Sequence, residues 1–177
     1  MRHFIAVTAL IALTLTTVCA NVVIQLANQR HIGYIEPHFR GILEPLYGDQ
    51  TLALEKMRTA GDRNTEVLME NGVIKGLLVY KTTPNSDYRP NLLEVKTFVL
   101  LSAAEDSRKG FGGKLLERVQ ELVHAYDMNG VLLTLSDAAP VSAHHFFRKH
   151  GFVAFTRHEE KYVDGVGETV MIQENRE

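Results

Sequence analysis

Apolar residues follow a helical spacing in several parts of the chain. The longest stripe comprises Leu115, Leu116, Val119, Leu122, Val123 and Tyr126. Segments 31–47 and 51–57 carry apolar residues at the same spacing, which predicts two earlier helices. A last helix is expected to begin at Pro140 and to end at Gly151. Gly130, after Asn129, is expected to stop the long helix, because glycine suits the left-handed position beyond a helix end.

Other runs have the composition of strands. Segments 64–71 and 72–81 meet at Asn71-Gly72, which is a strong hairpin signal because both positions accept positive φ. Val22–Ala27 alternates as a first strand, and the tail from residue 152 to 173 predicts closing antiparallel strands around Asp164-Gly165. Leu92–Leu101 is rich in Val, Phe and Leu, which indicates a strand buried on both faces. The unbroken apolar run Val131–Leu135 indicates a central strand.

The order of these elements predicts an α/β fold. Strand, glycine turn, helix and strand between residues 92 and 135 form a β-α-β crossover, and the earlier hairpin makes the sheet mixed. The chain has 177 residues, enough for one domain with a core and too few for two comfortable ones. The expected architecture is therefore one mixed central sheet flanked by helices.

The first twenty residues differ from the rest. A short basic start precedes Phe4–Val18, which is almost wholly apolar or Thr, and small residues follow at Val18–Ala20. This pattern predicts a secretory signal peptide over 1–20 and a single domain over 21–177. The alternatives are an extra N-terminal helix or a start codon assigned too far upstream. The first reading places the protein outside the cell or in the periplasm, without stable membrane association after cleavage, and a mis-assigned start places it in the cytoplasm. Cys19, the only cysteine, lies in this segment, so the rest of the chain forms no internal disulfide.

Charge narrows the range of partners. The formal net charge is −2, which gives no support to nucleic-acid or membrane binding driven by bulk charge. No metal site is predicted. A nucleic acid is expected as a partner only if the substrate is attached to tRNA. The sequence predicts no oligomeric state.

The segment SRKGFGGKLL, from Ser107 to Leu116, carries the clearest chemistry. A glycine turn at a helix N-terminus can bind an anion, because the first backbone N–H groups lack partners and the helix dipole adds positive charge. The alternative is a turn that only connects strand to helix. Leu115 stands where a P-loop has Ser or Thr and where the dinucleotide motif has its third glycine.

With this turn the sequence resembles the GNAT superfamily of acyl-CoA-dependent N-acetyltransferases. In that family an R/Q-x-x-G-x-G/A turn between the fourth strand and the third helix holds the pyrophosphate of coenzyme A. Ser107 to Gly112 stands at that motif, with the arginine displaced to Arg108, and HHFFRKHGF resembles the late LYxKxGF signature. The resemblance covers Val22 to about Gln173. It implies acetyl-CoA as co-substrate and a cofactor site made of Val99, Leu100, Leu101, Ser107, Arg108, Lys109, Gly110, Phe111, Gly112, Gly113 and Phe147.

The resemblance implies transfer of an acetyl group to a primary amine by direct attack. The acceptor is a small molecule, a peptide N-terminus, a lysine or an aminoacyl-tRNA. Many family members place a tyrosine acid where Phe147 stands, and phenylalanine cannot donate a proton. His144 shares a helix face with Phe147 and is one candidate donor, or it is a surface histidine. Glu94 is the candidate base, or it is a solvent-facing or ion-paired residue of the strand. The rival function is a non-catalytic acyl-CoA-binding or interaction protein with the same fold.

Overall fold

The computed structural model describes residues 21–59, 61–83, 88–101 and 109–175. Within these residues a seven-stranded sheet has the order β1-β2-β3-β4-β5-β7-β6. In chain order the elements are β1 (Val22–Leu26), α1 (Gln29–Tyr47), α2 (Thr51–Arg58), β2 (Arg63–Glu70), β3 (Val73–Lys81), β4 (Leu92–Leu100), α4 (Phe111–Ala125), β5 (Gly130–Ser136), α5 (Val141–Lys149), β6 (Val153–Val163) and β7 (Val166–Glu174). The predicted order of helices and strands is confirmed. The signal peptide predicted over 1–20 lies outside the described residues.

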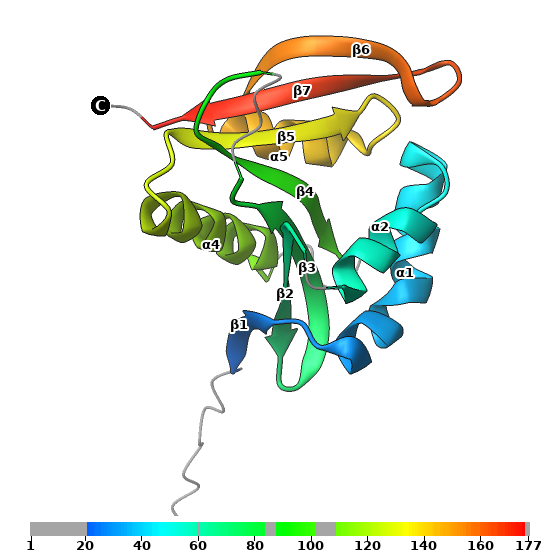
Figure 1. Ribbon diagram of the computed structural model, residues 1–177, viewed down its shortest axis with the longest axis vertical. Helices are drawn as coiled ribbons and strands as arrows, with labels where there is room; N and C mark the ends of the chain where they lie inside the picture. Colours follow the sequence, from blue (N-terminus) through cyan, green and yellow to red (C-terminus); the bar gives the residue numbers. More distant parts are fainter. Residues whose placement is uncertain (1–20, 60, 84–87, 102–108, 176–177) are drawn as a thin grey trace, which may run out of the picture.

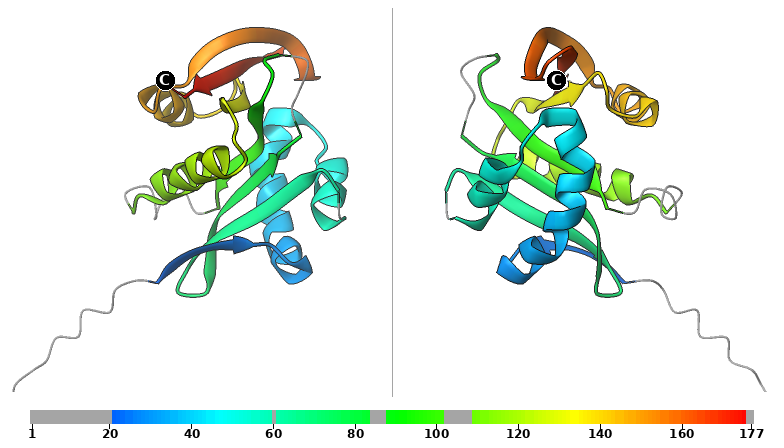
Figure 2. Two further views of the ribbon diagram at one scale, coloured as in Figure 1. Left: turned by 60° about the vertical axis from the view of Figure 1, so that its left-hand side comes forward. Right: turned by 90° about the vertical axis from the view of Figure 1, so that its right-hand side faces the viewer.

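The helices cover both faces of the sheet. Figures 1 and 2 show α1 and α2 on one face and α4 on the opposite face, with α5 beside β5. Only β4 and β5 pair in parallel, and every other neighbouring pair is antiparallel. The mixed sheet expected from the hairpin and the crossover is therefore present.

Two turns show how local sequence sets the fold. Asn71 and Gly72 both have positive φ, 51° and 82°, as the predicted hairpin between β2 and β3 requires. At the start of α1, the Asn28 side chain accepts from the His31 N–H, and the His31 side chain accepts from the Asn28 N–H. This reciprocal cap begins the helix at Gln29, two residues before the predicted segment.

The predicted role of Gly130 is wrong. Helix α4 ends at Ala125, and the left-handed residue after it is Asp127, with φ of 51°. Gly130 instead begins β5 with φ of 156°, and a Cβ there would lie 2.1 Å from the carbonyl oxygen of Gln173 in β7. Position 130 requires glycine because the backbones of β5 and β7 approach closely there. Tyr126, predicted to be part of the apolar stripe, is 47% exposed, because it follows the last helical turn.

The predicted closing strands are β6 and β7, and β6 is long and irregular. Residues 153–163 form this one strand. Its pairing with β7 is irregular between two residue pairs, His158 with Glu168 and Val163 with Val166. Between these pairs β6 has four residues and β7 has one. The residues between them form a wide bulge on β6, and Glu160 within it has φ of 52°.

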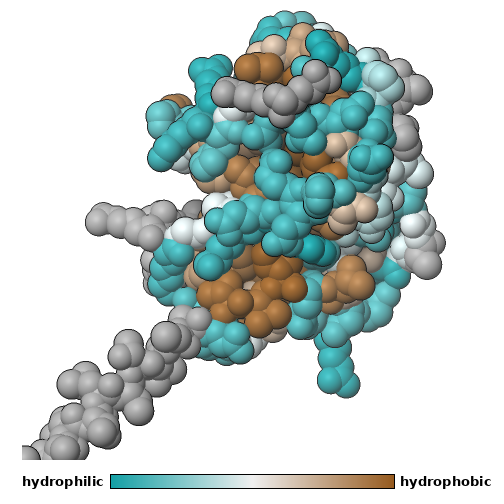
Figure 3. All heavy atoms as spheres, turned by 90° about the vertical axis from the view of Figure 1, so that its left-hand side faces the viewer, coloured by the Kyte–Doolittle hydropathy of each residue, from teal (hydrophilic) through white to brown (hydrophobic). Residues whose placement is uncertain are grey.

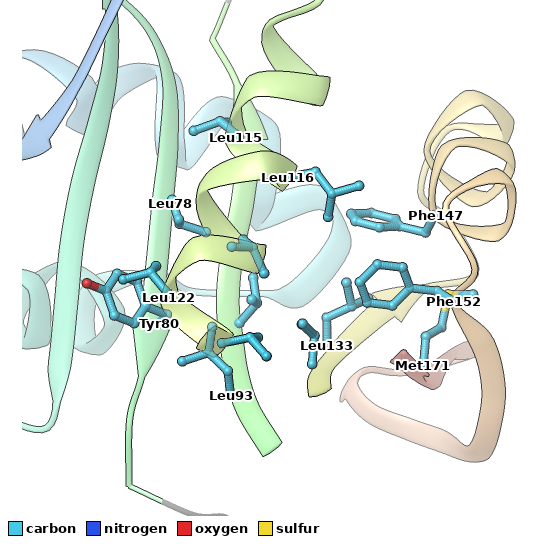
Figure 4. Packing of buried hydrophobic residues seen from close by; sticks show 14 of the residues in the cluster. Leu78, Tyr80, Leu93, Leu115, Leu116, Leu122, Leu133, Phe147, Phe152 and Met171 are labelled. Carbon is cyan, nitrogen blue, oxygen red and sulfur yellow. The ribbon is translucent and has the colours of Figure 1, made fainter. Parts of the chain in front are cut away.

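Two main clusters of buried side chains lie on opposite sides of the sheet. One packs α4 and α5 against the strands, and Figure 4 shows Leu116 of α4 directed toward Phe147 of α5. The other packs α1 and α2 around Ile35, Phe39 and Leu54, none of which is exposed. The stripe predicted for α4 is buried from Leu115 to Val123. Burial of apolar area on both faces is the main stabilising contribution to this fold.

A buried carboxylate joins the sheet to α4. Glu66 of β2 is 3% exposed and accepts two hydrogen bonds from Arg118, each 2.9 Å long. The Tyr80 hydroxyl donates to the same carboxylate at 3.1 Å. Burial, with the Glu66 carboxylate beside it, raises the pKa of Tyr80, so the phenol keeps its proton and remains a donor. Three donors thus compensate the charge of Glu66 inside the protein.

We expect Arg118→Met to lower the free energy of unfolding by about 3 kcal/mol, because it leaves a buried carboxylate without its cation. Urea denaturation measures the change. The double variant Glu66→Gln/Arg118→Met should recover part of the loss, and Arg148→Met on the exposed face of α5 serves as the matched control. A loss for Arg118→Met no larger than that of the control would contradict this role.

The outer surface is mostly polar on the side of α4. Figure 3 shows hydrophilic areas with several apolar patches between them. Between β1 and α4 a shallow depression is lined by Val22 and Ile24 and by charged residues of α4. Among the described residues, no helix is both long and apolar enough to cross a membrane.

Candidate functional site

Strands β4 and β5 separate partway along their length. They pair in parallel from Leu92 with Gly130 to Val95 with Leu133, and β4 then continues to Leu100 without this partner. At the same level the pairing of β4 with β3 shifts, so that Lys96 is an extra residue in β4. Such a bulge bends a strand and strengthens its twist. The end of β4 therefore has an open edge toward β5.

The open edge of β4 exposes particular backbone groups. The Leu101 N–H donates to the Lys75 carbonyl at 2.9 Å, so Leu101 faces β3. In an antiparallel pair the direction alternates, so Val99 also faces β3, whereas Phe98 and Leu100 direct their N–H groups away from it. Of the three amides that the sequence singled out, only that of Leu100 faces the opening.

The three glycines at the start of α4 have different surroundings. Gly110 precedes the helix with φ of 74°, a conformation that favours glycine. A Cβ on Gly112 would lie 3.3 Å from the Phe146 ring and 4.0 Å from Leu100, so a larger residue there would require the ring to shift by a few tenths of an ångström. A Cβ on Gly113 would meet no atom within 4 Å.

The N-terminus of α4 is suited to an anion. Its N-cap residue, Gly110, has no side chain, none of the described side chains caps the helix, and its first turn contains no acidic residue. The first N–H groups of a helix have no acceptor within the helix, and the dipole favours negative charge there. Nearby, Lys109 forms an ion pair with Glu70 at 3.1 Å. Ser107 and Arg108, also assigned to this turn, lie outside the described residues.

The glycine turn and the open edge of β4 lie next to each other. Gly112 lies beside Leu100 on one side and the Phe146 ring of α5 on the other. The start of α4, the end of β4 and α5 therefore converge, so one extended ligand could contact helix amides and strand amides together.

A groove of about 410 Å³ opens on the other side of the separated strands. It is bounded by the end of α1, by α2, β4, β5, α5 and the bulge of β6. Its lining consists of Leu43, Tyr47, Asp49, Gln50, Leu52, Ala53, Arg63, Tyr88, Glu94, Val95, Lys96, Thr97, Phe98, Leu133, Thr134, Leu135, Phe147, Lys161 and Tyr162. The groove thus reaches from α1 through the gap between β4 and β5 to α5.

Glu94 lies in this groove. It is 7% exposed, and its carboxylate accepts from the ammonium group of Lys96, two residues along β4. The solvent-facing alternative for Glu94 is therefore wrong, whereas the ion-paired alternative describes its contact.

Helix α5 carries two of the predicted site residues, Phe147 and His144, and they differ in position. Phe147 lines the groove, is 5% exposed, and packs with ring centroids 5.4 Å from Phe98 and 5.3 Å from Phe152. Its side chain is a hydrocarbon and cannot donate a proton. His144, one turn earlier, is partly buried and is not among the residues that line the groove.

Two tyrosines, which the sequence did not single out together, form one wall of the groove. The Tyr47 hydroxyl accepts from the Ser136 N–H at 3.0 Å and donates to the Thr134 carbonyl at 3.3 Å. Burial raises the pKa of Tyr47, so it remains a neutral phenol. Its ring meets Tyr162 edge to face, with 5.7 Å between centroids. In the sequence, the one sign that Tyr47 could belong to the site is its place as an aromatic residue at the end of a predicted helix.

Ser136 stabilises the local backbone through its side chain. Its side chain is fully buried and its hydroxyl accepts from the Ala138 N–H at 3.2 Å, which stabilises the turn after β5. Tyr88 pairs its hydroxyl with the His158 ring at 2.9 Å. Among the described residues no group of His, Cys, Asp or Glu side chains could hold a metal ion.

The sequence matches no protein-family model and no curated protein. Solved structures are similar to it: Arabidopsis thaliana NAA60 in complex with a bisubstrate analogue has 12% identity and a TM-score of 0.71, covering 88% of this chain and 100% of that one. Ard1 from Thermoplasma volcanium has 20% identity and a TM-score of 0.71, covering 88% of this chain and 99% of its own. A GNAT family acetyltransferase from Elizabethkingia anophelis with acetyl-CoA bound has 14% identity and a TM-score of 0.65, with coverage of 88% and 99%. The chain has the fold of the GNAT acetyltransferases.

Proposed function

We propose that the protein is an N-acetyltransferase that uses acetyl-CoA and acetylates a primary amine by direct attack. One observation carries the proposal: the open edge of β4 lies beside the uncapped start of α4 and opens onto a groove on the far side. Solved structures of the same fold were determined with acetyl-CoA or with a bisubstrate analogue, which supports the choice of co-substrate.

The residues that would bind acetyl-CoA follow from the geometry. The N–H groups of Phe111, Gly112 and Gly113 would bind the pyrophosphate, beside Gly110 and Lys109. Ser107 and Arg108 remain predictions for the same turn. Along β4, the N–H groups of Phe98 and Leu100 would hold the acyl and pantetheine carbonyls, in place of the amides of Val99 and Leu101.

The groove would hold the amine. Glu94 accepts a proton from the attacking amine, directly or through water, while a strand amide stabilises the charge that develops on the thioester oxygen. The packed rings of Phe98 and Phe147 would exclude water from the thioester sulfur of acetyl-CoA. His144 remains a candidate proton donor to the leaving thiolate.

The rival function, binding of acyl-CoA without catalysis, is favoured by one observation, the absence of a proton donor on Phe147. Two measurements separate the functions. Acetyl-CoA at about 100 times its Kd should stabilise the protein by about 2.7 kcal/mol, which corresponds to a Tm increase of roughly 5–10 °C at this size. Thiol release that depends on added amine supports the enzyme, and a Tm increase without release supports the rival. No Tm increase at saturating acetyl-CoA contradicts both.

The compartment remains a prediction. Cleavage after Ala20 would place the domain outside the cytoplasm, and a start near Val22 would keep it inside. N-terminal sequencing of the native protein separates these outcomes.

A further inference from the structure

The groove contains more positive than negative charge once its ion pairs are counted. Its charged lining residues are Asp49, Arg63, Glu94, Lys96 and Lys161. Glu94 is paired with Lys96. Asp49 lies 3.5 Å from Arg40, which is outside the groove and also pairs with Glu36 and Glu44, so the lining holds three cations and two carboxylates. In the part of the chain that the structure describes, neither Arg63 nor Lys161 has a carboxylate within ion-pair distance. These two cations belong to different walls, formed by β2 and β6.

The backbone holds Lys161 at the groove. It lies in the wide bulge of β6, and its N–H donates to the carboxylate of Glu168, a fully buried residue of β7, at 3.2 Å. Its ammonium group lies 5.4 Å from the centre of the Tyr162 ring, which in turn packs on Tyr47. The aromatic wall thus supports a cation at the rim of the groove.

Lys161 carries its charge at neutral pH. Burial is the largest single influence and acts to lower the pKa of Lys161, but Tyr162 and Tyr88 together outweigh it. The net shift of this pKa is upward, so the side chain stays an ammonium group throughout the neutral range. Its charge is therefore available to a ligand in the groove.

Two cations that lack an ion-paired carboxylate make the groove discriminate among amines by their charge. A simple amine is protonated at neutral pH and is repelled by both, and a polycation is repelled more strongly. An acceptor with its own anionic group gains an attraction that offsets this repulsion. The same cations favour the neutral, nucleophilic form of an amine near them.

We propose that the acceptor carries a carboxylate near its amine, and that Lys161 binds this carboxylate in the groove, while Arg63, on the distant strand β2, adds to the positive charge there. The inference rests on the proposed function and names the substrate class for it: short amino-acid or peptide acceptors that are zwitterionic, and not polyamines or other polycations. Leu52, 61% exposed at the groove, would lie beside the apolar part of such an acceptor.

Dialanine and trialanine, each with a free or an amidated carboxyl terminus, test the charge preference because only that group changes. The value of kcat/KM should be about ten-fold higher for the free carboxylates, the size of one charge-assisted hydrogen bond. Lys161→Met should reduce this ratio to near one, mainly through KM of the free acids. Lys161→Glu should invert it. Lys149→Met, at the exposed end of α5, is the matched control and should keep the wild-type ratio.

Binding provides a readout that does not require turnover. In calorimetry, N-acetyldialanine should bind about ten-fold more tightly than its amide, and high salt should remove the difference. Equal affinity, or no detectable binding of either compound, overturns the carboxylate proposal. A ratio that survives Lys161→Met overturns the role of Lys161. Absence of acetyl-CoA turnover with every amine contradicts the proposed function instead and leaves the calorimetric comparison valid.

Discussion

Gly113→Asp is expected to abolish the increase in Tm that acetyl-CoA produces. The new carboxylate would lie in the first turn of α4, beside the amides that would bind the pyrophosphate. At about 5 Å and an effective dielectric constant near 20, each pair of unit charges repels by about 3 kcal/mol. Binding should therefore weaken by at least about 100-fold. Thermal denaturation with increasing acetyl-CoA measures the change.

The unliganded variant should remain folded, which makes the result interpretable. A Cβ at Gly113 would meet no atom of the described residues outside its own helix within 4 Å, and an acidic residue near a helix N-terminus is stabilising. Its Tm without ligand should equal or exceed that of the unmodified protein. Gly113→Asn has nearly the same shape without the charge and should keep most of the ligand-dependent increase. If Gly113→Asp still gives the full increase, the pyrophosphate does not bind at this helix.

Glu94→Gln is expected to lower kcat by about 100- to 1,000-fold if the carboxylate is the general base. The amide keeps the size of the side chain but accepts protons poorly, so the loss should appear in kcat more than in KM. The acetyl-CoA-dependent increase in Tm should not change, because Glu94 lies away from the start of α4. Steady-state kinetics with saturating acetyl-CoA and increasing amine measures kcat and KM separately.

The matched control for Glu94 is Glu55→Gln, which changes an exposed carboxylate of α2 outside the groove. It should leave kcat and KM unaltered. A Glu94→Gln variant that retains kcat within about three-fold of the unmodified protein would show that the carboxylate serves only its ion pair with Lys96.

The order of the elements was predictable because each carries a local signal. The apolar stripe of α4 and the Asn71-Gly72 turn depend on residues close in sequence, so pattern and structure agree. The role of Gly130 was not predictable, because it depends on a strand more than forty residues later in the chain. A glycine looks the same in the sequence whether it ends a helix or admits a neighbouring strand.

The candidate site was predictable in part for the same reason. The glycine turn and Glu94 were visible as unusual residues in their local setting, and the structure places Glu94 in the groove. The extra residue at Lys96 has no sequence signal, since a bulge depends on the pairing of β4 with β3. It also decides which amides face the opening. Tyr47, Lys161 and Tyr162 come together only through tertiary folding, from α1 and the bulge of β6.

The separation of β4 from β5 leaves the sheet as two halves joined by a short ladder. Four residue pairs, from Leu92 with Gly130 to Val95 with Leu133, connect strands β1–β4 to strands β5–β7. A ligand that lies against Phe98 and Leu100 would act as a surrogate strand and supply the missing hydrogen bonds. Binding of such a ligand would then also strengthen the connection between the two halves of the sheet.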